Sequence, residues 1–138
     1  MNVSEVMTRD VKITSPDESL QKAAKMMEHN DFGILPVGEH DRLVGMLTDR
    51  DITTRAVARG ISPKSKVRDV MTSAVKYVYE DESVQDAARN MSQLQVRRLP
   101  VLNRDKRLVG IVSLGDLANR RDDAAGVALR GVSQRDTD

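Results

Sequence analysis

The sequence contains no cysteine and no tryptophan, and its aromatic residues are one Phe and two Tyr: Phe32, Tyr77 and Tyr79. Without cysteine the chain forms no disulfide, thiolate zinc site, iron–sulfur ligation or cysteine nucleophile. So few aromatic side chains leave no stacking surface of the kind that holds single-stranded nucleic acid. We therefore expect an aliphatic core and no nucleic-acid partner.

An excess of one charge and long apolar runs are also missing. The 22 Lys and Arg against 21 Asp and Glu leave a formal charge of +1, which creates no strong field toward a polyanion or an anionic membrane. No apolar run approaches the roughly 18 residues of a membrane span, and the N-terminus lacks a signal-peptide pattern. At 138 residues the chain is long enough to bury a core. We expect a cytoplasmic protein without a membrane partner.

The chain aligns with itself after a shift of 64 residues. Val-Met-Thr occurs at 6–8 and 70–72, and Leu-Pro-Val occurs at 35–37 and 99–101. After a one-residue insertion in the second copy, Arg-Leu-Val-Gly follows in both copies. We predict two repeats of similar structure. They comprise residues 1–62 and 63–121, followed by a tail at 122–138 that we expect to be disordered or used in self-association.

Each repeat begins with an extended segment and a helix. In the first copy, residues 11–14 are extended, and Ser15 is the predicted N-cap of a helix with Pro16 at its first position. Apolar residues spaced three and four apart predict one buried face for this helix and for its counterpart. These residues are Leu20, Ala23, Ala24 and Met27 in the first copy, and Val84, Ala87, Ala88 and Met91 in the second.

Two strands and a second helix complete each repeat. In the first copy, the strands are predicted at 34–37 and 43–47, and the helix runs from Thr48 to near Gly60, a suitable C-terminal glycine. The order strand, helix, strand, strand, helix in both copies predicts an α+β fold.

A hydroxyl residue followed three positions later by an aspartate marks the corner between the last strand and last helix of each repeat. The pairs are Thr48 with Asp51 and Ser113 with Asp116. Such a pair forms a capping box. It also places an acceptor-only carboxylate, which can accept from both vicinal hydroxyls of a ribose, beside backbone N–H groups that favour an anion. Both interpretations remain open at this point.

Taken together and occurring twice, these motifs resemble a tandem pair of cystathionine-β-synthase (CBS) domains, a Bateman module, over residues 1 to about 121. The chain is also similar to stand-alone bacterial CBS-pair proteins. The resemblance implies two repeats packed through their sheets about a pseudo-twofold axis, with clefts for AMP, ADP, ATP, NAD or S-adenosylmethionine. It implies that Asp51 and Asp116 bind the ribose, with Thr48 and Ser113 near the ribose or phosphate.

The same resemblance implies an adenine-binding wall made of strand residues. They are Lys12, Ile13, Thr14, Ile34 and Pro36 in the first copy, and Tyr77, Arg98 and Pro100 in the second. Phosphates require cations, and Arg50, Arg97 and Arg98 are the main candidates, followed by Lys12 and Arg121. Because the copies differ at these positions, we expect two clefts that are not equivalent.

No catalytic or metal-binding motif accompanies these residues. His29 and His40 have no second ligand at metal spacing, so we expect both at the surface and no metal requirement. We predict a non-enzymatic regulatory protein, a sensor of energy, redox state or stress, that forms a homodimer and acts on an unidentified protein partner. The alternative is a ligand-free scaffold dimer.

Overall fold

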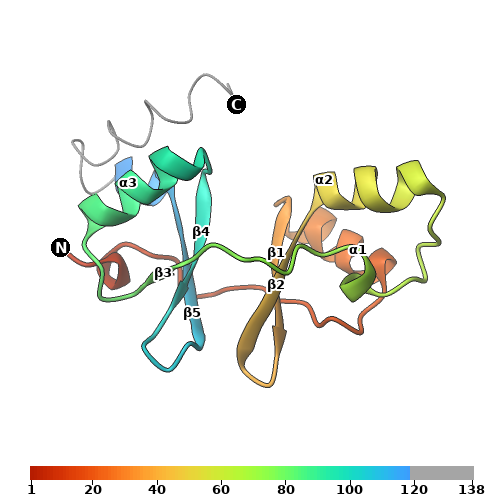
Figure 1. Ribbon diagram of the computed structural model, residues 1–138, viewed down its shortest axis with the longest axis horizontal. Coiled ribbons are helices and arrows are strands. Elements are labelled where there is room, and N and C mark those ends of the chain that lie inside the picture. Colours follow the sequence, from red (N-terminus) through yellow and green to blue (C-terminus); the bar gives the residue numbers. More distant parts are fainter. Residues whose placement is uncertain (119–138) are drawn as a thin grey trace. The chain divides into compact units, whose positions relative to one another are not determined.

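The computed structural model describes residues 1–118, so Arg121 and the predicted tail at 122–138 lie outside the described residues. Within the described part the chain has an α+β fold, as predicted, and divides into two compact units (Figure 1). Unit 1 consists of Met1–Val11 together with residues 76–118, and unit 2 consists of Lys12–Val75.

Unit 2 contains a two-stranded antiparallel sheet, β1 (Ile34–Glu39) with β2 (Arg42–Thr48), to which Thr14 adds a parallel bridge at Val37. Helix α1 (Leu20–Asn30) precedes the sheet. After β2 come α2 (Asp49–Asp51), a π-helical turn (Ile52–Ala56) and 3-10 turns at Val57–Arg59 and Val67–Asp69.

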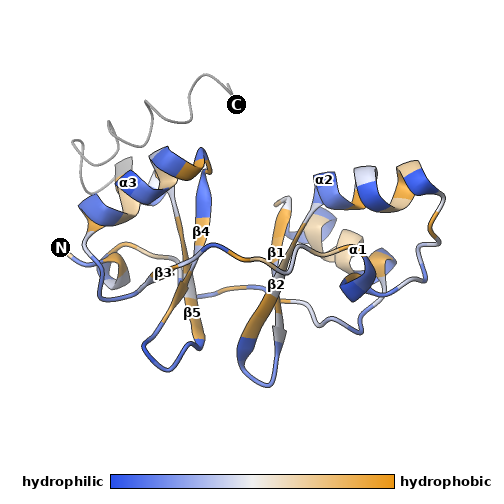
Figure 2. Cartoon of the chain, viewed as in Figure 1, coloured by the Kyte–Doolittle hydropathy of each residue, from blue (hydrophilic) through white to orange (hydrophobic). Residues whose placement is uncertain are grey.

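Unit 1 repeats this arrangement. Its sheet has the order β3-β4-β5, with β3 (Val78–Tyr79) parallel to β4 (Arg98–Leu102) and β4 antiparallel to β5 (Leu108–Ser113). A 3-10 turn (Val3–Glu5) precedes the sheet, α3 (Val84–Leu94) separates β3 from β4, and α4 (Leu114–Ala118) follows β5. Each unit has its own aliphatic core, and the strands carry much of the hydrophobic character (Figure 2).

The compact units are offset from the sequence repeats. Thr8, from the first Val-Met-Thr motif, exchanges backbone hydrogen bonds of 2.8 and 2.9 Å with Ile111 of β5 in unit 1. Thr72, from the second motif, does the same with Met46 of β2 in unit 2. The predicted boundaries at 62 and 121 therefore describe the sequence duplication. The chain passes from unit 1 to unit 2 after residue 11 and back to unit 1 after residue 75.

The pairing of each Val-Met-Thr segment with a strand explains why both copies have the glycine of Leu-Val-Gly. A Cβ atom at Gly45 would lie 2.6 Å from Met71 Sδ, and one at Gly110 would lie 2.7 Å from Met7 Sδ. Only glycine lets the methionine-containing segment approach the strand so closely. In each unit, the methionine of a Val-Met-Thr motif thus packs on the glycine of a Leu-Val-Gly motif.

The prediction that Ser15 caps the first helix is wrong. Helix α1 begins at Leu20, and its N-cap is Ser19, whose Oγ accepts from the Lys22 N–H at 3.1 Å. The carbonyl groups of Pro16 and Glu18 accept instead from the backbone of residues 67–68, at 2.8 to 2.9 Å. This contact with a segment some 50 residues away in the sequence therefore moves the start of α1 from the predicted Pro16 to Leu20.

The buried helix faces are confirmed except at one position. Leu20, Ala23 and Met27 are buried in unit 2, but Ala24 is exposed, whereas its counterpart Ala88 is fully buried in unit 1. The last helices of the two units differ as well. In unit 1 α4 packs against α3 with Leu117 fully buried, whereas the equivalent Ile52 of unit 2 is only half-buried.

The predicted second helix has the expected ends but not a continuous α-helical interior. Thr48 is its N-cap and Gly60, with φ of 69°, closes the last turn. Between them the α-helix gives way to the π-helical turn. Thr53 and Thr54 donate their hydroxyls to the carbonyls four residues earlier, at 3.0 and 2.9 Å, and this competition widens the turn.

Candidate functional site

In each sheet one face is turned to the core of its unit, and we call the opposite face the outer face. Directly paired residues of antiparallel strands share a face, and the faces alternate along each strand. In unit 2 the pair Leu35 and Leu47 belongs to the core, so the pair Ile34 and Thr48 lies on the outer face, and Pro36 lies there as well.

The extended segment before α1 adds to the same outer face. Thr14 bridges the core residue Val37, so the preceding Ile13 points to the other side, where its Cδ1 lies beside Gly38 and 48% of the residue is exposed. Four predicted residues, Ile13, Ile34, Pro36 and Thr48, therefore come together on the outer face of unit 2.

The side chain of Thr14 does not join them, although the resemblance places the segment 12–14 in the adenine-binding wall. It is 5% exposed on the core side, and within the part of the chain that the structure describes its hydroxyl has no hydrogen-bond partner. Its backbone is fully used, because its N–H donates to Pro36 O at 3.0 Å and its carbonyl accepts from Gly38 at 2.9 Å.

Unit 1 presents an equivalent outer face of different character. Arg98 pairs with Ser113, and Pro100 pairs with Ile111, whereas Val78 and Val101 pair on the core side. Tyr77, next to Val78, is turned away from the core, and its ring meets the Tyr79 ring edge-on with centroids 5.5 Å apart. The predicted residues Tyr77, Arg98, Pro100 and Ser113 therefore share this face.

The corner pairs form capping boxes in both units. The Thr48 N–H donates to Asp51 Oδ2 at 3.0 Å, and the Asp51 N–H donates back to Thr48 Oγ1 at 3.0 Å. The corresponding distances between Ser113 and Asp116 are 2.9 and 3.2 Å. The capping interpretation of these residues is thus confirmed. Each box uses one carboxylate oxygen, so the other oxygen and further lone pairs of each aspartate remain outside it.

Arg55 is a residue of this corner that sequence reasoning missed. Its Nη2 lies 3.7 Å from Asp51 Oδ1, and its Nη1 donates to the Val70 carbonyl and to Thr72 Oγ1, each at 3.0 Å. The spacing of an acid and an arginine four residues apart was the available signal. Arg55 thereby holds the second oxygen of Asp51 in place and ties it to the segment that packs on β2.

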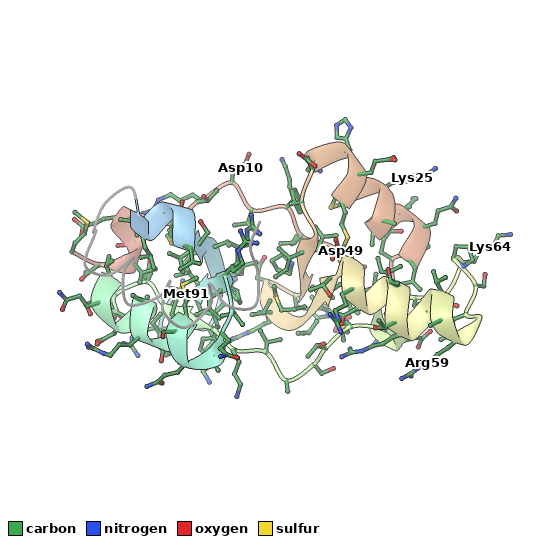
Figure 3. All side chains as sticks on the ribbon, turned by 90° about the horizontal axis from the view of Figure 1, so that it is seen from above. Asp10, Lys25, Asp49, Arg59, Lys64 and Met91 are labelled. Carbon is green, nitrogen blue, oxygen red and sulfur yellow. The ribbon has the colours of Figure 1, made fainter. Side chains whose placement is uncertain are left out.

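The predicted cations are divided between the two units. Lys12 and Arg50 are exposed in unit 2, with Arg50 immediately before Asp51, while Arg98 is exposed and Arg97 half-buried in unit 1. Figure 3 labels Asp49, which starts α2 where β2 ends and so stands beside Arg50 and the capping box.

Neither histidine belongs to this region, since His29 and His40 are both exposed, as expected. Among residues 1–118 no group of three or more His, Cys, Asp or Glu side chains could hold a metal ion. In that same part of the chain, no helix is long and apolar enough to cross a membrane.

Comparison with known proteins identifies what this architecture resembles. The family model of the CBS domain matches residues 3–57 and 67–123. The chain is 40% identical over 136 residues to the CBS domain-containing protein YhcV of Bacillus subtilis, covering 97% of this chain and 96% of that protein. It also matches the crystal structure of Hypoxic Response Protein I with two coordinated zinc ions, at 37% identity and a TM-score of 0.78, over 86% of this chain and 98% of that one.

Two further solved structures carry adenosine compounds. The structure of CBSX2 in complex with AMP is 27% identical, with a TM-score of 0.76, over 88% of this chain and 96% of that one. The CBS domain pair of MJ0100, in complex with 5′-methylthioadenosine and S-adenosyl-L-methionine, is 31% identical, with a TM-score of 0.72, over 86% of this chain and 94% of that one.

Proposed function

Because the chain belongs to the CBS domain family and carries the domain twice, we propose that it is a regulatory protein that binds an adenosine-containing nucleotide. AMP, ADP, ATP and NAD are the candidate ligands, together with S-adenosylmethionine. The site in each unit is the strand-to-helix corner with the adjoining outer face of the sheet.

The observation that carries this proposal is the corner aspartate, present at the same place in both units. Each aspartate is held by its capping box through one carboxylate oxygen. The other oxygen of Asp51 lies 3.7 Å from Arg55 Nη2 and keeps lone pairs that can accept further hydrogen bonds. An ionised carboxylate held in this way accepts charge-assisted hydrogen bonds from the vicinal hydroxyls of a ribose without first having to become ordered.

The outer faces supply the apolar surface that an adenine ring needs. In unit 2 this surface comes from Ile13 and Ile34, and in unit 1 it comes from Tyr77, whereas Pro36 and Pro100 lie on the same faces but are buried. Pockets for such ligands are mostly apolar with a few placed polar groups, and this composition matches. The AMP complex of CBSX2 and the methylthioadenosine complex of MJ0100 support the same ligand class.

We take the role to be regulatory and not catalytic, with the ligand shifting the arrangement of a homodimer that a partner protein recognises in the cytoplasm. Such a shift requires that the nucleotide bind one arrangement better than the other. We propose that nucleotide binding needs no metal ion. The zinc ions of Hypoxic Response Protein I make this a point to test directly, by repeating the titrations with and without added zinc.

A ligand-free scaffold is the second candidate, and the capping boxes favour it. An aspartate whose only function is to cap a helix would make the same hydrogen bonds to its own backbone as Asp51 and Asp116 do. Ligand binding is what separates the two candidates.

Thermal unfolding with AMP, ATP, NAD and S-adenosylmethionine tests both candidates. A ligand present at 100 times its Kd adds about 2.7 kcal/mol to the free energy of unfolding, so the sensor shows a clear rise in Tm. The scaffold shows none with any of the four compounds.

Variants of the corner then identify the site. Asp51→Ala and Asp116→Ala should each abolish binding at one corner and, as lost caps, cost about 1 kcal/mol of stability. Ser19→Ala and Ser83→Ala remove the caps of α1 and α3 and are the matched controls, since they lose similar stability but keep both ligand sites. Unchanged stoichiometry and affinity in both aspartate variants would favour the scaffold.

A further inference from the structure

We propose that the two corners select adenosine ligands of different charge: the corner of unit 1 takes a phosphate-bearing nucleotide, and the corner of unit 2 takes an adenosine compound without phosphate. This inference rests on the proposed function. It follows from side chains that differ between two otherwise equivalent backbones.

The first difference lies on the outer face, opposite the corner hydroxyl. In unit 1 the residue paired with Ser113 is Arg98, which is exposed. In unit 2 the residue paired with Thr48 is Ile34. Directly paired residues have Cβ atoms roughly 5 Å apart, so a phosphate beside Ser113 is within reach of the Arg98 guanidinium, whose planar fork suits phosphate oxygens. A phosphate beside Thr48 meets an aliphatic side chain.

The second difference lies at the first residue of the last helix. The Asp49 N–H donates to the Gly33 carbonyl at 2.9 Å, and in unit 1 the Leu114 N–H donates to the Arg97 carbonyl at 3.0 Å. The backbone contact is the same, but unit 2 places an acid and a glycine where unit 1 places an apolar residue and an arginine.

The glycine and the acid of unit 2 depend on each other. A Cβ atom at Gly33 would lie 2.6 Å from Asp49 Oδ2, so the carboxylate occupies the space that a side chain at position 33 would need. The exposed Asp49 thus adds negative charge directly beside Thr48 and its capping box. A phosphate at this corner would be repelled by it.

The remaining charges do not reverse this contrast. At one position unit 2 has Asp31 and unit 1 has Gln95, and at another unit 2 has Arg50 and unit 1 has Gly115. The charge of Arg50 offsets one of the two carboxylates, Asp31 or Asp49. Lys12 and its counterpart Lys76 are the same in both copies, so they do not discriminate. Arg55 adds a second cation beside Asp51, so Asp49 and Asp51 of unit 2 face Arg50 and Arg55, whereas Asp116 of unit 1 faces Arg97 and Arg98. The corner of unit 1 therefore has an arginine excess, and the corner of unit 2 has none.

Isothermal titration of the full chain with AMP and with adenosine tests the inference. The wild type should bind one AMP per chain. Arg98→Gln should weaken AMP binding about tenfold or more, because it loses a charge-assisted contact to phosphate, and should change adenosine affinity less than about twofold. Arg89→Gln, an equal charge change on the exposed side of α3, is the matched control and should bind both compounds as the wild type does.

The converse experiment gives unit 2 the residues of unit 1. The double variant Ile34→Arg with Asp49→Leu should raise the AMP stoichiometry from one to two per chain. Two equivalent AMP sites in the wild type would overturn the inference, and so would an equal loss of AMP and adenosine binding in Arg98→Gln. If neither these two compounds nor ADP, ATP, NAD or S-adenosylmethionine bind the wild type, the proposed function fails and this inference fails with it. If AMP binds but Arg98→Gln leaves its affinity unchanged, the inference alone fails.

Discussion

Replacement of Thr14 by valine is expected to make the protein more stable. The Thr14 side chain lies on the core side of the unit 2 sheet with 5% of the residue exposed, and its Oγ1 has no hydrogen-bond partner among the described residues. Its backbone N–H and carbonyl are both satisfied by β1, so the hydroxyl is the one polar group of this residue that folding removes from water without compensation.

The other repeat shows that the site accepts valine. Val78 occupies the equivalent position in unit 1, pairs with Val101 as Thr14 pairs with Val37, and is fully buried in the core. Valine and threonine have the same branched shape, so the change creates no cavity and no crowding.

The expected gain follows from the cost of burying an unpaired hydroxyl. That cost is about 1–3 kcal/mol, so Thr14→Val should raise the free energy of unfolding by about 1–2 kcal/mol. Urea denaturation should show a higher midpoint with an unchanged m-value, and the Tm should rise by several degrees.

The reverse change supplies the matched control. Val78→Thr should lower stability by a similar amount, because it buries an unpaired hydroxyl in unit 1. A Thr14→Val variant that is neutral or less stable than the wild type would refute the reasoning, since it would mean that the hydroxyl is hydrogen-bonded in the folded protein.

Three further outcomes are expected. Gly45→Ala should cost about 1–3 kcal/mol in urea denaturation, because the new methyl group would lie 2.6 Å from Met71 Sδ; an unchanged midpoint would contradict the close packing. Arg55→Ala should lower the free energy of unfolding by about 1 kcal/mol and speed amide exchange in residues 70–72, because the hydrogen bonds from Arg55 to this segment are lost. Unaltered exchange there would show that these hydrogen bonds do not stabilise the segment. The hydrogen bond from Arg68 lowers the pKa of Asp17 from its usual 3.8. The stability that Asp17 adds is therefore present above the usual value and is lost as the pH falls through the lowered pKa. The difference in Tm between wild type and Asp17→Asn should be constant above about pH 5 and shrink as the pH is lowered from there, and a difference that stays constant would argue against the ion pair.

Much of the fold was predictable because it rests on local patterns. The duplication, the strand–helix–strand–strand–helix order and the positions of the strands follow from hydrophobic spacing and short motifs. The corner pairs were also predictable as capping boxes, because a hydroxyl and an acid three residues apart meet at a helix start regardless of what surrounds them.

Part of the candidate site could likewise be identified beforehand. Ile13, Ile34, Pro36 and Thr48 lie on one face in the structure, since alternation along a strand is a local property. The side chain of Thr14 lies on the core side instead, because neighbouring residues of a strand point to opposite faces, and its assignment to the site stays a prediction.

The sequence by itself therefore determined the features that short stretches of chain specify locally: the repeat, the order of elements and the corner pairs. Only the tertiary structure decided that Ser19 and not Ser15 caps α1, that the Val-Met-Thr segments pack in the unit built largely from the other repeat, and that Arg55 joins Asp51 to Thr72. Each of these depends on a hydrogen bond or packing contact between residues distant in the sequence. Such contacts override local preference because a buried backbone group must find a partner wherever the fold supplies one.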